Sequence, residues 1–190
     1  HLLGTLDSPD SGPKKFGPYQ IIRILGEGGM GAVYRARRVH IGDDVAVKVL
    51  HADLLVKPQA IERFRREART TSALNHPNIA TIHEIGESEG VNFIAMEFID
   101  GDDLSSLLRR IGRLPPDKAV EIARQLCAGL HAVHQAGVLH RDFKPANVMI
   151  DGRGKARITD FGIAGLENEL KAGAVAGTAK ASSPAPTSST

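Results

Sequence analysis

The residues best suited to chemistry gather in one short stretch, residues 138–162 (VLHRDFKPANVMIDGRGKARITDFG). It carries Asp142, Lys144 and Asn147 close together, and Asp160 follows them. Carboxylate and amide oxygens are ligands that Mg²⁺ prefers, and a lysine can neutralise an anionic group. This order and spacing suits phosphoryl transfer, which depends on positioning and on charge neutralisation more than on covalent catalysis. A single triplet such as His-Arg-Asp or Asp-Phe-Gly would be a weak signal, but both in one stretch are a strong one.

A glycine pattern near the N-terminus could hold the phosphates of a nucleotide. Gly26, Gly28 and Gly31 are followed by Val33. Because glycine has no Cβ, backbone N–H groups can come close to phosphate oxygens. Glycine-rich hairpins without a ligand are common, so this pattern carries weight only together with other motifs.

Lys48 is the candidate cation that would face those phosphates. It lies in the apolar segment 45–50, and its neighbours on the same strand face, Ala46 and Leu50, are apolar. We therefore expect its ammonium group to point into a cleft and to need an anion. Glu67, on a predicted helix, is the candidate partner. The alternative is a surface glutamate among the arginines of that helix.

The pattern of apolar residues predicts a small, mostly antiparallel first lobe. The expected strands cover residues 19–25, 32–37, 45–50, 79–85 and 91–98. The glycine-rich segment connects two strands, and a hairpin of this kind differs from the strand-to-helix turn of a dinucleotide fold. A helix is expected over residues 59–74, and it ends before Pro77 because proline cannot continue a helix.

Beyond residue 101 the apolar period changes from that of strands to that of helices. Helices are expected over residues 102–111 and 117–135, each opening on an aspartate that can cap backbone N–H groups. In the second helix we expect one apolar face to form core, with Cys127 as a buried, inert thiol. That face comprises Ile122, Leu126, Leu130 and Val133, beside Ala119, Ala123 and Cys127. Short strands are expected at residues 148–150 and 156–158.

Composition is that of a globular protein and excludes several partners. The chain has 190 residues, 42% of them hydrophobic and 24% charged, with a net charge of +2. This charge is too small to indicate nucleic-acid binding, and the basic cluster at residues 63, 65, 66 and 69 is expected to be a solvated helix face. No apolar run is long enough to span a membrane and no signal peptide is evident, so we expect a cytoplasmic location. The chain begins with His1, which suggests a piece of a longer protein that could itself carry a membrane segment.

Four motifs together resemble the protein serine/threonine kinases, and most of all the bacterial receptor-like (Hanks-type) group. The motifs are residues 24–34 (ILGEGGMGAVY), 64–68 (FRREA), 74–79 (LNHPNI) and 140–147 (HRDFKPAN). The resemblance runs from about residue 19 to 178. It implies an α+β, two-lobed protein-kinase-like fold with an antiparallel N-lobe and one main helix (19–98) and a partial helical C-lobe (99–171). Composition predicts a leader or linker (1–18) and a low-complexity, disordered end (172–190).

The resemblance also implies roles for residues of an ATP site. The adenine would lie between apolar side chains and against the backbone that joins the lobes, with Met96 as the gatekeeper and Asp103 at the ribose. The residues expected around the base are Leu25, Val33, Ala46 and Met149, with the backbone of Glu97 and Ile99.

At the phosphate end, the resemblance implies that Lys48, oriented by Glu67, holds the α- and β-phosphates under the glycine-rich segment. Asn147 and Asp160 would bind Mg²⁺, with Mn²⁺ as a possible substitute. Asp142 would accept the proton of the substrate hydroxyl, and Lys144 would neutralise the γ-phosphate. The expected activity is transfer of the ATP γ-phosphate to Ser and Thr of protein substrates.

The end of the chain departs from the family pattern. Gly177, Thr178 and Pro184 fit, but Ala181 and Ala185 stand where the family has a tyrosine and a glutamate. The sequence therefore predicts a C-terminally truncated kinase. It leaves open an alternative, a catalytically impaired nucleotide-binding or scaffold fragment of such a kinase.

Overall fold

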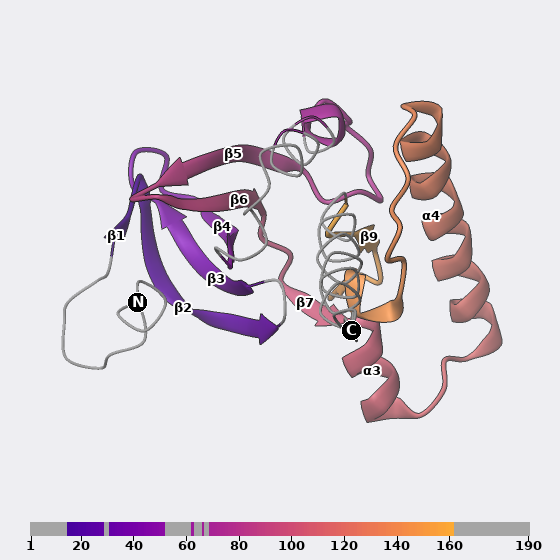
Figure 1. Cartoon of the computed structure of the whole chain (residues 1–190). Coiled ribbons are helices and arrows are strands. Elements are labelled where there is room, and N and C mark those ends of the chain that lie inside the picture. The colour runs from indigo at the N-terminus through magenta and orange to yellow at the C-terminus, as the bar shows by residue number, and fades with distance from the viewer. Residues whose placement is uncertain (1–14, 29–30, 52–61, 63–65, 67–68, 162–190) are drawn as a thin grey trace, which may run out of the picture.

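The computed structural model describes residues 15–28, 31–51, 62, 66 and 69–161. They form a β-sheet on one side and a mainly helical part on the other, joined by the segment that follows strand β6 (Figure 1). Glu67 and residues 162–190, on which several predictions fall, lie outside the described residues.

The sheet is antiparallel and six-stranded, with the order β1-β2-β3-β4-β6-β5. Its strands are β1 (Lys15–Phe16), β2 (Tyr19–Gly28), β3 (Gly31–Arg38), β4 (Asp44–Leu50), β5 (Ile82–Ser88) and β6 (Val91–Glu97). As predicted, β2 and β3 form a hairpin around the glycine-rich segment, with Gly28 opposite Gly31. Figure 1 shows the strands curling around one another.

One face of this sheet is closed by aromatic side chains. Phe16, Tyr19, Tyr34 and Phe93 are buried there together with β-branched residues of β4. The rings of Phe16 and Tyr19 meet Phe93 edge-on, with centroids 5.3 and 5.5 Å apart. Such edge-to-face pairs add to the free energy gained by burial. With this face filled, the other face of the sheet is left for the cleft.

Three expectations for this part need correction. The predicted leader is too long, because Lys15 and Phe16 form a strand and the Phe16 ring is buried. The sheet consequently has six strands, where five were expected. Strand β5 begins at Ile82, and Ile79 instead forms a parallel bridge with Ile158. Of the predicted helix 59–74, residues 62, 66 and 69–72 are helical among those described.

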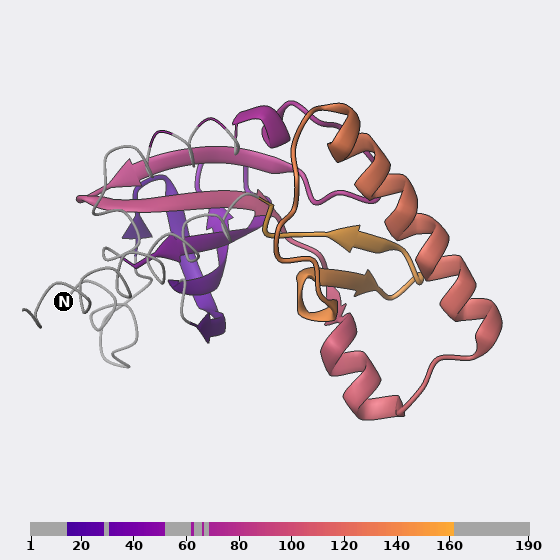
Figure 2. The same cartoon turned by 45° about the vertical axis from the view of Figure 1, so that its right-hand side comes forward.

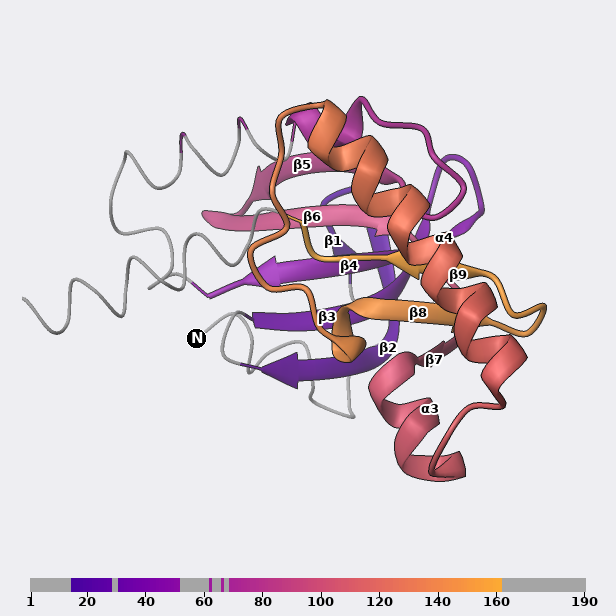
Figure 3. The same cartoon turned by 90° about the vertical axis from the view of Figure 1, so that its right-hand side faces the viewer.

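The second part combines two helices with a three-stranded sheet of order β7-β8-β9. Its elements are β7 (Gly101–Asp103), α3 (Leu104–Ile111), α4 (Pro116–Gln135), a 3₁₀ turn (Pro145–Asn147), β8 (Val148–Asp151) and β9 (Ala156–Ile158). Helix α4 packs against β9, and Figure 3 shows it lying across that strand. Among the described residues, no helix is long and apolar enough to cross a membrane.

The helix starts differ from those predicted. Asp102 belongs to β7, and the cap of α3 is Asp103, whose carboxylate accepts a hydrogen bond from the Ser106 N–H at 2.8 Å. Helix α4 begins at Pro116, and its N-cap residue Pro115 has no side-chain acceptor. Proline is suited to a first helical turn because its fixed φ is already helical.

The predicted apolar face of α4 is half correct. Ile122 and Val133 are buried and Leu126 and Leu130 pack against the same clusters. The adjoining small residues Ala119 and Ala123 are exposed, as is Cys127. The prediction of a buried thiol was therefore wrong, since the described part of the chain covers only one side of this helix.

The two parts are joined by hydrogen bonds around Asn78. Its carbonyl accepts from the Ile158 N–H at 2.9 Å, and its amide donates to Gln125 on α4 at 3.0 Å and to the Ala156 carbonyl at 2.9 Å. Helix α4 can approach this segment because residue 129 is glycine: a Cβ there would lie 2.9 Å from the Asn78 carbonyl oxygen. Figure 2 shows α4 and β9 reaching the sheet at this side. These contacts fix the position of the three-stranded sheet relative to the six-stranded sheet.

Candidate active site

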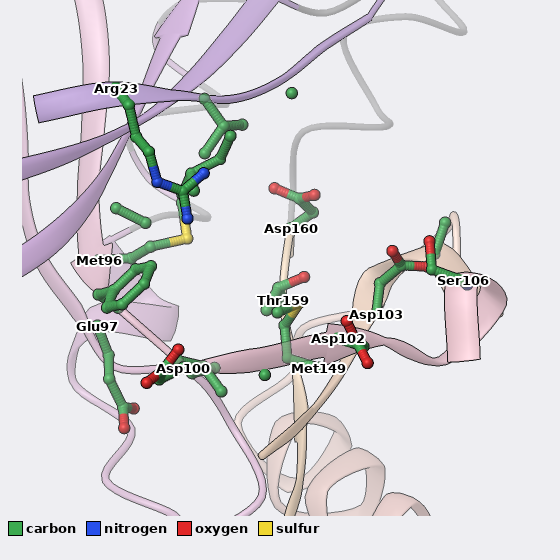
Figure 4. Close-up of a pocket in the computed structure, with 18 residues that line it drawn as sticks. Arg23, Met96, Glu97, Asp100, Asp102, Asp103, Ser106, Met149, Thr159 and Asp160 are labelled. Carbon is green, nitrogen blue, oxygen red and sulfur yellow. The ribbon is translucent and has the colours of Figure 1, made fainter. Parts of the chain in front are cut away.

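A cavity of about 440 Å³ lies between the six-stranded sheet and the three-stranded sheet. Figure 4 shows that side chains of both parts, such as Met96 and Met149, face it. Of the predicted site residues, those that line it are Leu25, Gly26, Val33, Ala46, Met96, Glu97, Ile99, Asp103, Met149 and Asp160. The structure thus brings together most residues expected around a nucleotide, from segments far apart in the sequence.

Strand register produces the apolar end of the cavity, which we call the base end. Val33 lies opposite Lys48, and Ala46 lies opposite Met96, so these side chains share the face of the sheet that looks into the cavity. Met149, on β8, supplies the opposite wall. A flat apolar ring would fit between these walls.

The polypeptide at the base end offers backbone groups to a ligand. The Glu97 N–H is already bound to the Thr81 carbonyl at 2.8 Å, so only the Glu97 carbonyl can serve as its contact to a base. Ile99 is buried and lines the cavity. A donor at Ile99 and an acceptor at Glu97 match the edge of an adenine, as the sequence resemblance implies.

Lys48 is buried and has an anionic partner that lines the cavity. Its side chain is 7% exposed, and its Nζ donates to Oδ1 of Asp160 at 2.8 Å. Asp160 adopts a left-handed backbone conformation, with φ of 62°. The described partner of Lys48 is therefore Asp160, and its pairing with Glu67 stays a prediction.

Asp142 and Lys144 form a second charged pair, in a loop that hydrogen bonds connect to the segment carrying Asp160. We call this loop, together with Lys48 and Asp160, the phosphate end. The Lys144 Nζ lies 2.7 Å from Oδ2 of Asp142, and the amide of Asn147 donates to the Asp142 carbonyl at 2.8 Å. Partial burial alone would raise the pKa of Asp142, but the hydrogen bond and charge of Lys144 outweigh it and lower that pKa below its usual range. The Asp142 carboxylate is therefore ionised at neutral pH.

His140 supports this loop from inside, a role that was not assigned from the sequence. It is buried, its Nδ1 accepts from the Asp142 N–H at 3.3 Å, and its Nε2 lies 2.8 Å from the Thr159 carbonyl. With Nδ1 as acceptor, Nε2 carries the proton and donates to Thr159. The ring also packs on Phe161, with centroids 4.6 Å apart. His140 thus links the Asp142 loop to the segment that carries Asp160.

The oxygen ligands needed for a magnesium ion are present at this end. The Thr159 N–H donates to the Asn147 carbonyl at 2.9 Å, which ties Asn147 to the residue before Asp160. Within the described ranges, no group of three or more His, Cys, Asp or Glu could hold a metal ion by itself. Mg²⁺ usually binds one or two protein oxygens together with substrate phosphates. Asn147 and Asp160 fit that kind of site.

Some site features differ from the sequence analysis or were missed by it. The Asp103 carboxylate, expected at a ribose, uses one oxygen to cap α3. Gly28 and Gly31 lie at the end of the β2–β3 hairpin, where a Cβ on Gly31 would come within 1.9 Å of the Val49 carbonyl oxygen. Phe98 lines the cavity and is held under the guanidinium group of Arg35, 4.5 Å from the ring centroid. Further lining residues that were not predicted are Arg23, Asp100, Gly101, Asp102, Ser106, Ala146 and Thr159.

The fold, the cleft and the charged pairs are those of the protein-kinase class. The protein kinase domain family matches residues 19–186, and the chain belongs to that family.

Among bacterial relatives, it is 45% identical over 162 residues to the serine/threonine-protein kinase PknA of Mycobacterium tuberculosis, covering 83% of this chain and 38% of PknA. It is 40% identical over 153 residues to PrkC of Bacillus subtilis, covering 80% of this chain and 24% of PrkC. The chain thus spans less than half the length of these relatives.

The solved kinase domain of M. tuberculosis PknI superposes with a TM-score of 0.74 at 33% identity. The match covers 86% of this chain and 67% of that domain. The predicted two-lobed kinase fold is confirmed, with the six-stranded sheet as its first lobe.

Proposed function

We propose that this chain is the nucleotide-binding and catalytic part of a protein serine/threonine kinase. It uses ATP with Mg²⁺, or Mn²⁺ in its place, and transfers the γ-phosphate to Ser and Thr hydroxyls of protein substrates. The observation that carries this proposal is the ion pair, 2.8 Å long, between the buried Lys48 and Asp160, which lines the cavity. We place the reaction in the cytoplasm, where ATP is available, and expect no nucleic-acid partner at a net charge of +2.

The charged residues divide the work of phosphoryl transfer between them. Lys48 binds the α- and β-phosphates, while Asp160 and Asn147 hold the metal ion. A Mg²⁺ ion held by these residues would neutralise the charge that develops on the phosphate oxygens. Because Lys48 and Asp160 already touch, their charges are positioned before the nucleotide enters, and little reorganisation is needed.

Asp142 orients the acceptor hydroxyl and takes its proton. Its lowered pKa keeps it ionised, so it accepts a hydrogen bond from the hydroxyl at any physiological pH. A weakly basic carboxylate suits a loose transition state, in which the proton leaves late. Lys144, 2.7 Å from Asp142, would neutralise the charge of the γ-phosphate.

A second candidate is a nucleotide-binding scaffold that does not complete the transfer. The exposed small residues of α4 favour it, because Ala119, Ala123 and Cys127 form an uncovered face in the described part of the chain. This candidate predicts ATP binding without phosphorylation of protein substrates.

Thermal unfolding with and without Mg-ATP, followed by a transfer assay, tests both candidates. A ligand that binds only the folded state adds about 2.7 kcal/mol of stability at a hundredfold excess over its Kd. Asp142→Asn should keep that stabilisation and abolish transfer to a protein substrate. Asp117→Asn, an exposed change in α4, is the matched control and should keep both. Transfer that survives Asp142→Asn would contradict the proposed role of Asp142, and a chain without any response to Mg-ATP would contradict both candidates.

A further inference from the structure

Three charged residues lie behind the base end of the cavity, and we call them the hinge cluster: Glu97, Asp151 and Arg157. Nε of Arg157 lies 3.3 Å from Oε1 of Glu97, and its Nη1 lies 3.2 Å from Oδ2 of Asp151. The Arg157 side chain is only 17% exposed. The cluster therefore connects the last residue of β6 to the β8–β9 hairpin.

Glu97 contributes its backbone to the base end of the cavity and its side chain to the hinge cluster. Its backbone belongs to the base end, and Figure 4 shows its side chain leading away from Met96 and from the cavity. One carboxylate oxygen faces Arg157, and the other accepts from the Thr81 N–H at 3.3 Å. The side chain is thus held from two directions, which limits rotation of the peptide that follows it.

The register of the small sheet places Arg157 beside Met149, on the same face of that sheet. Met149 lies opposite Asp103 on one side and opposite Arg157 on the other. The alternate residues of β9, Ala156 and Ile158, are fully buried on the opposite face. Arg157 therefore lies next to Met149, which forms the wall of the base end, and its side chain extends from that wall to Glu97.

Asp151 holds the other end of the arginine and its own turn. Its Oδ1 accepts from the N–H groups of Arg153 and Lys155, both at 2.9 Å, while its Oδ2 binds Arg157. These backbone hydrogen bonds, the one from Lys155 first, lower the pKa of Asp151. Arg157 is thus paired with a carboxylate that two backbone N–H groups of the β8–β9 hairpin hold in place.

We propose that Arg157 is a positioning residue for the nucleobase, which sets the separation between the Glu97–Ile99 backbone and the Met149 wall. It touches no ligand itself and acts through Glu97. This inference rests on the proposed function, since it assumes a purine at the base end. The planar guanidinium group of Arg157 can bind two carboxylates at once, which a lysine ammonium group cannot do with the same geometry.

Loss of the hinge cluster should weaken the binding of ligands that contain the nucleobase and spare the binding of ligands that contain phosphates alone. Arg157→Gln should weaken binding of adenosine and of Mg-ATP alike by about fivefold, a usual size for the loss of one coupled pair. Binding of magnesium tripolyphosphate, which has no base, should stay within about twofold because its contacts lie at the phosphate end. A residue that only stabilised the fold would not separate these ligands.

Isothermal titration of the 190-residue chain with adenosine, Mg-ATP and magnesium tripolyphosphate tests the inference. The variants are Arg157→Gln, Arg157→Lys, Glu97→Gln and the Arg157→Gln, Glu97→Gln double variant. Exposed Arg153 in the same hairpin gives the matched control, Arg153→Gln. The double variant should bind adenosine no more weakly than Arg157→Gln alone, because Arg157 acts through Glu97. Arg157→Lys, which keeps one ion pair, should bind with intermediate affinity.

Three results would overturn the inference in distinguishable ways. Unchanged adenosine affinity in Arg157→Gln, with a lowered melting temperature, would show a structural role and overturn the inference alone. Where Arg157→Gln does not fold, Arg157→Lys and Glu97→Gln decide, and normal adenosine affinity in both would overturn it. No binding of adenosine or Mg-ATP by the unchanged chain would overturn the proposed function and the inference with it.

Discussion

The base end and the phosphate end of the cleft are constructed in different ways. The base end is made by neighbouring strands whose register places Val33, Ala46 and Met96 on one face, and it is closed by Met149 from below. The phosphate end joins residues from distant segments: Lys48 and Asp160 are 112 positions apart and meet through a single ion pair. Packing positions the first, whereas individual polar contacts position the second.

This difference determines how each end should respond to substitution. Apolar contacts are many and individually small, so the loss of one side chain at the base end weakens binding gradually. A buried charged pair has no comparable redundancy, because removal of one partner leaves the other charge in a poorly solvated site. Substitutions at the two ends should therefore differ in size and in the ligand that they affect.

Among the substitutions that compare the binding of ligands at the two ends, the largest effect is expected for Asp160→Asn at the phosphate end. The variant removes a candidate metal ligand and the anionic partner of Lys48, whose side chain is 7% exposed. We expect transfer to fall by at least about a hundredfold, as for the loss of one stabilising group at a charged transition state. The Mg²⁺ dependence of ATP binding should weaken, and adenosine affinity should stay within about twofold. Calorimetric titrations with and without Mg²⁺ measure this.

Asp117→Asn, on the exposed first turn of α4, is the control for Asp160→Asn. It makes the same chemical change far from the cleft and should alter none of these quantities. If Asp160→Asn reduced adenosine affinity as strongly as Mg-ATP affinity, the two ends would not be independent and the comparison would fail.

The residues of the phosphate end could be singled out from the sequence because they stand in fixed motifs. The structure brings Asp142, Lys144 and Asn147 into contact, and their roles in catalysis stay predictions. Contacts that depend on strand register were not predictable. From the sequence, Arg157 cannot be distinguished from an ordinary strand arginine. The pairing of β8 with β9 places it beside Met149.

Burial was the other property that the sequence could not supply. Cys127 lies one residue from Leu126 on an apolar helix, yet it is exposed while Leu126 packs against the core. Periodicity shows which residues share a face, but it does not show how wide the covering surface is. The cap of α3 was misplaced for a different reason: β7 extends to Asp103, so Asp103 and not Asp102 is the N-cap.

A moderate effect is expected for Met149→Ala at the base end. Its side chain is half-buried in the wall of the cavity, opposite Ala46 and Val33. Removing the thioether contacts should cost about 1 kcal/mol, which weakens adenosine and Mg-ATP roughly fivefold each. Magnesium tripolyphosphate should bind as before, the reverse of the pattern expected for Asp160→Asn. Equal loss for all three ligands would mean that Met149 shapes the whole cleft.

The smallest effect is expected for the protonation of His140, which links the two loops of the phosphate end. Burial lowers the pKa of His140 below its usual 6.5, although its hydrogen bond to the Thr159 carbonyl acts in the opposite direction. Because the folded state disfavours the proton, this contribution to stability is fully present above pH 6.5 and is lost as the pH falls through the folded-state pKa. Urea unfolding between pH 7.5 and 5 should show a smaller decline for His140→Asn than for the unchanged chain. His131→Asn, an exposed change on α4, should keep the full decline. Equal declines in all three proteins would mean that protonation of His140 does not limit the stability of the phosphate end.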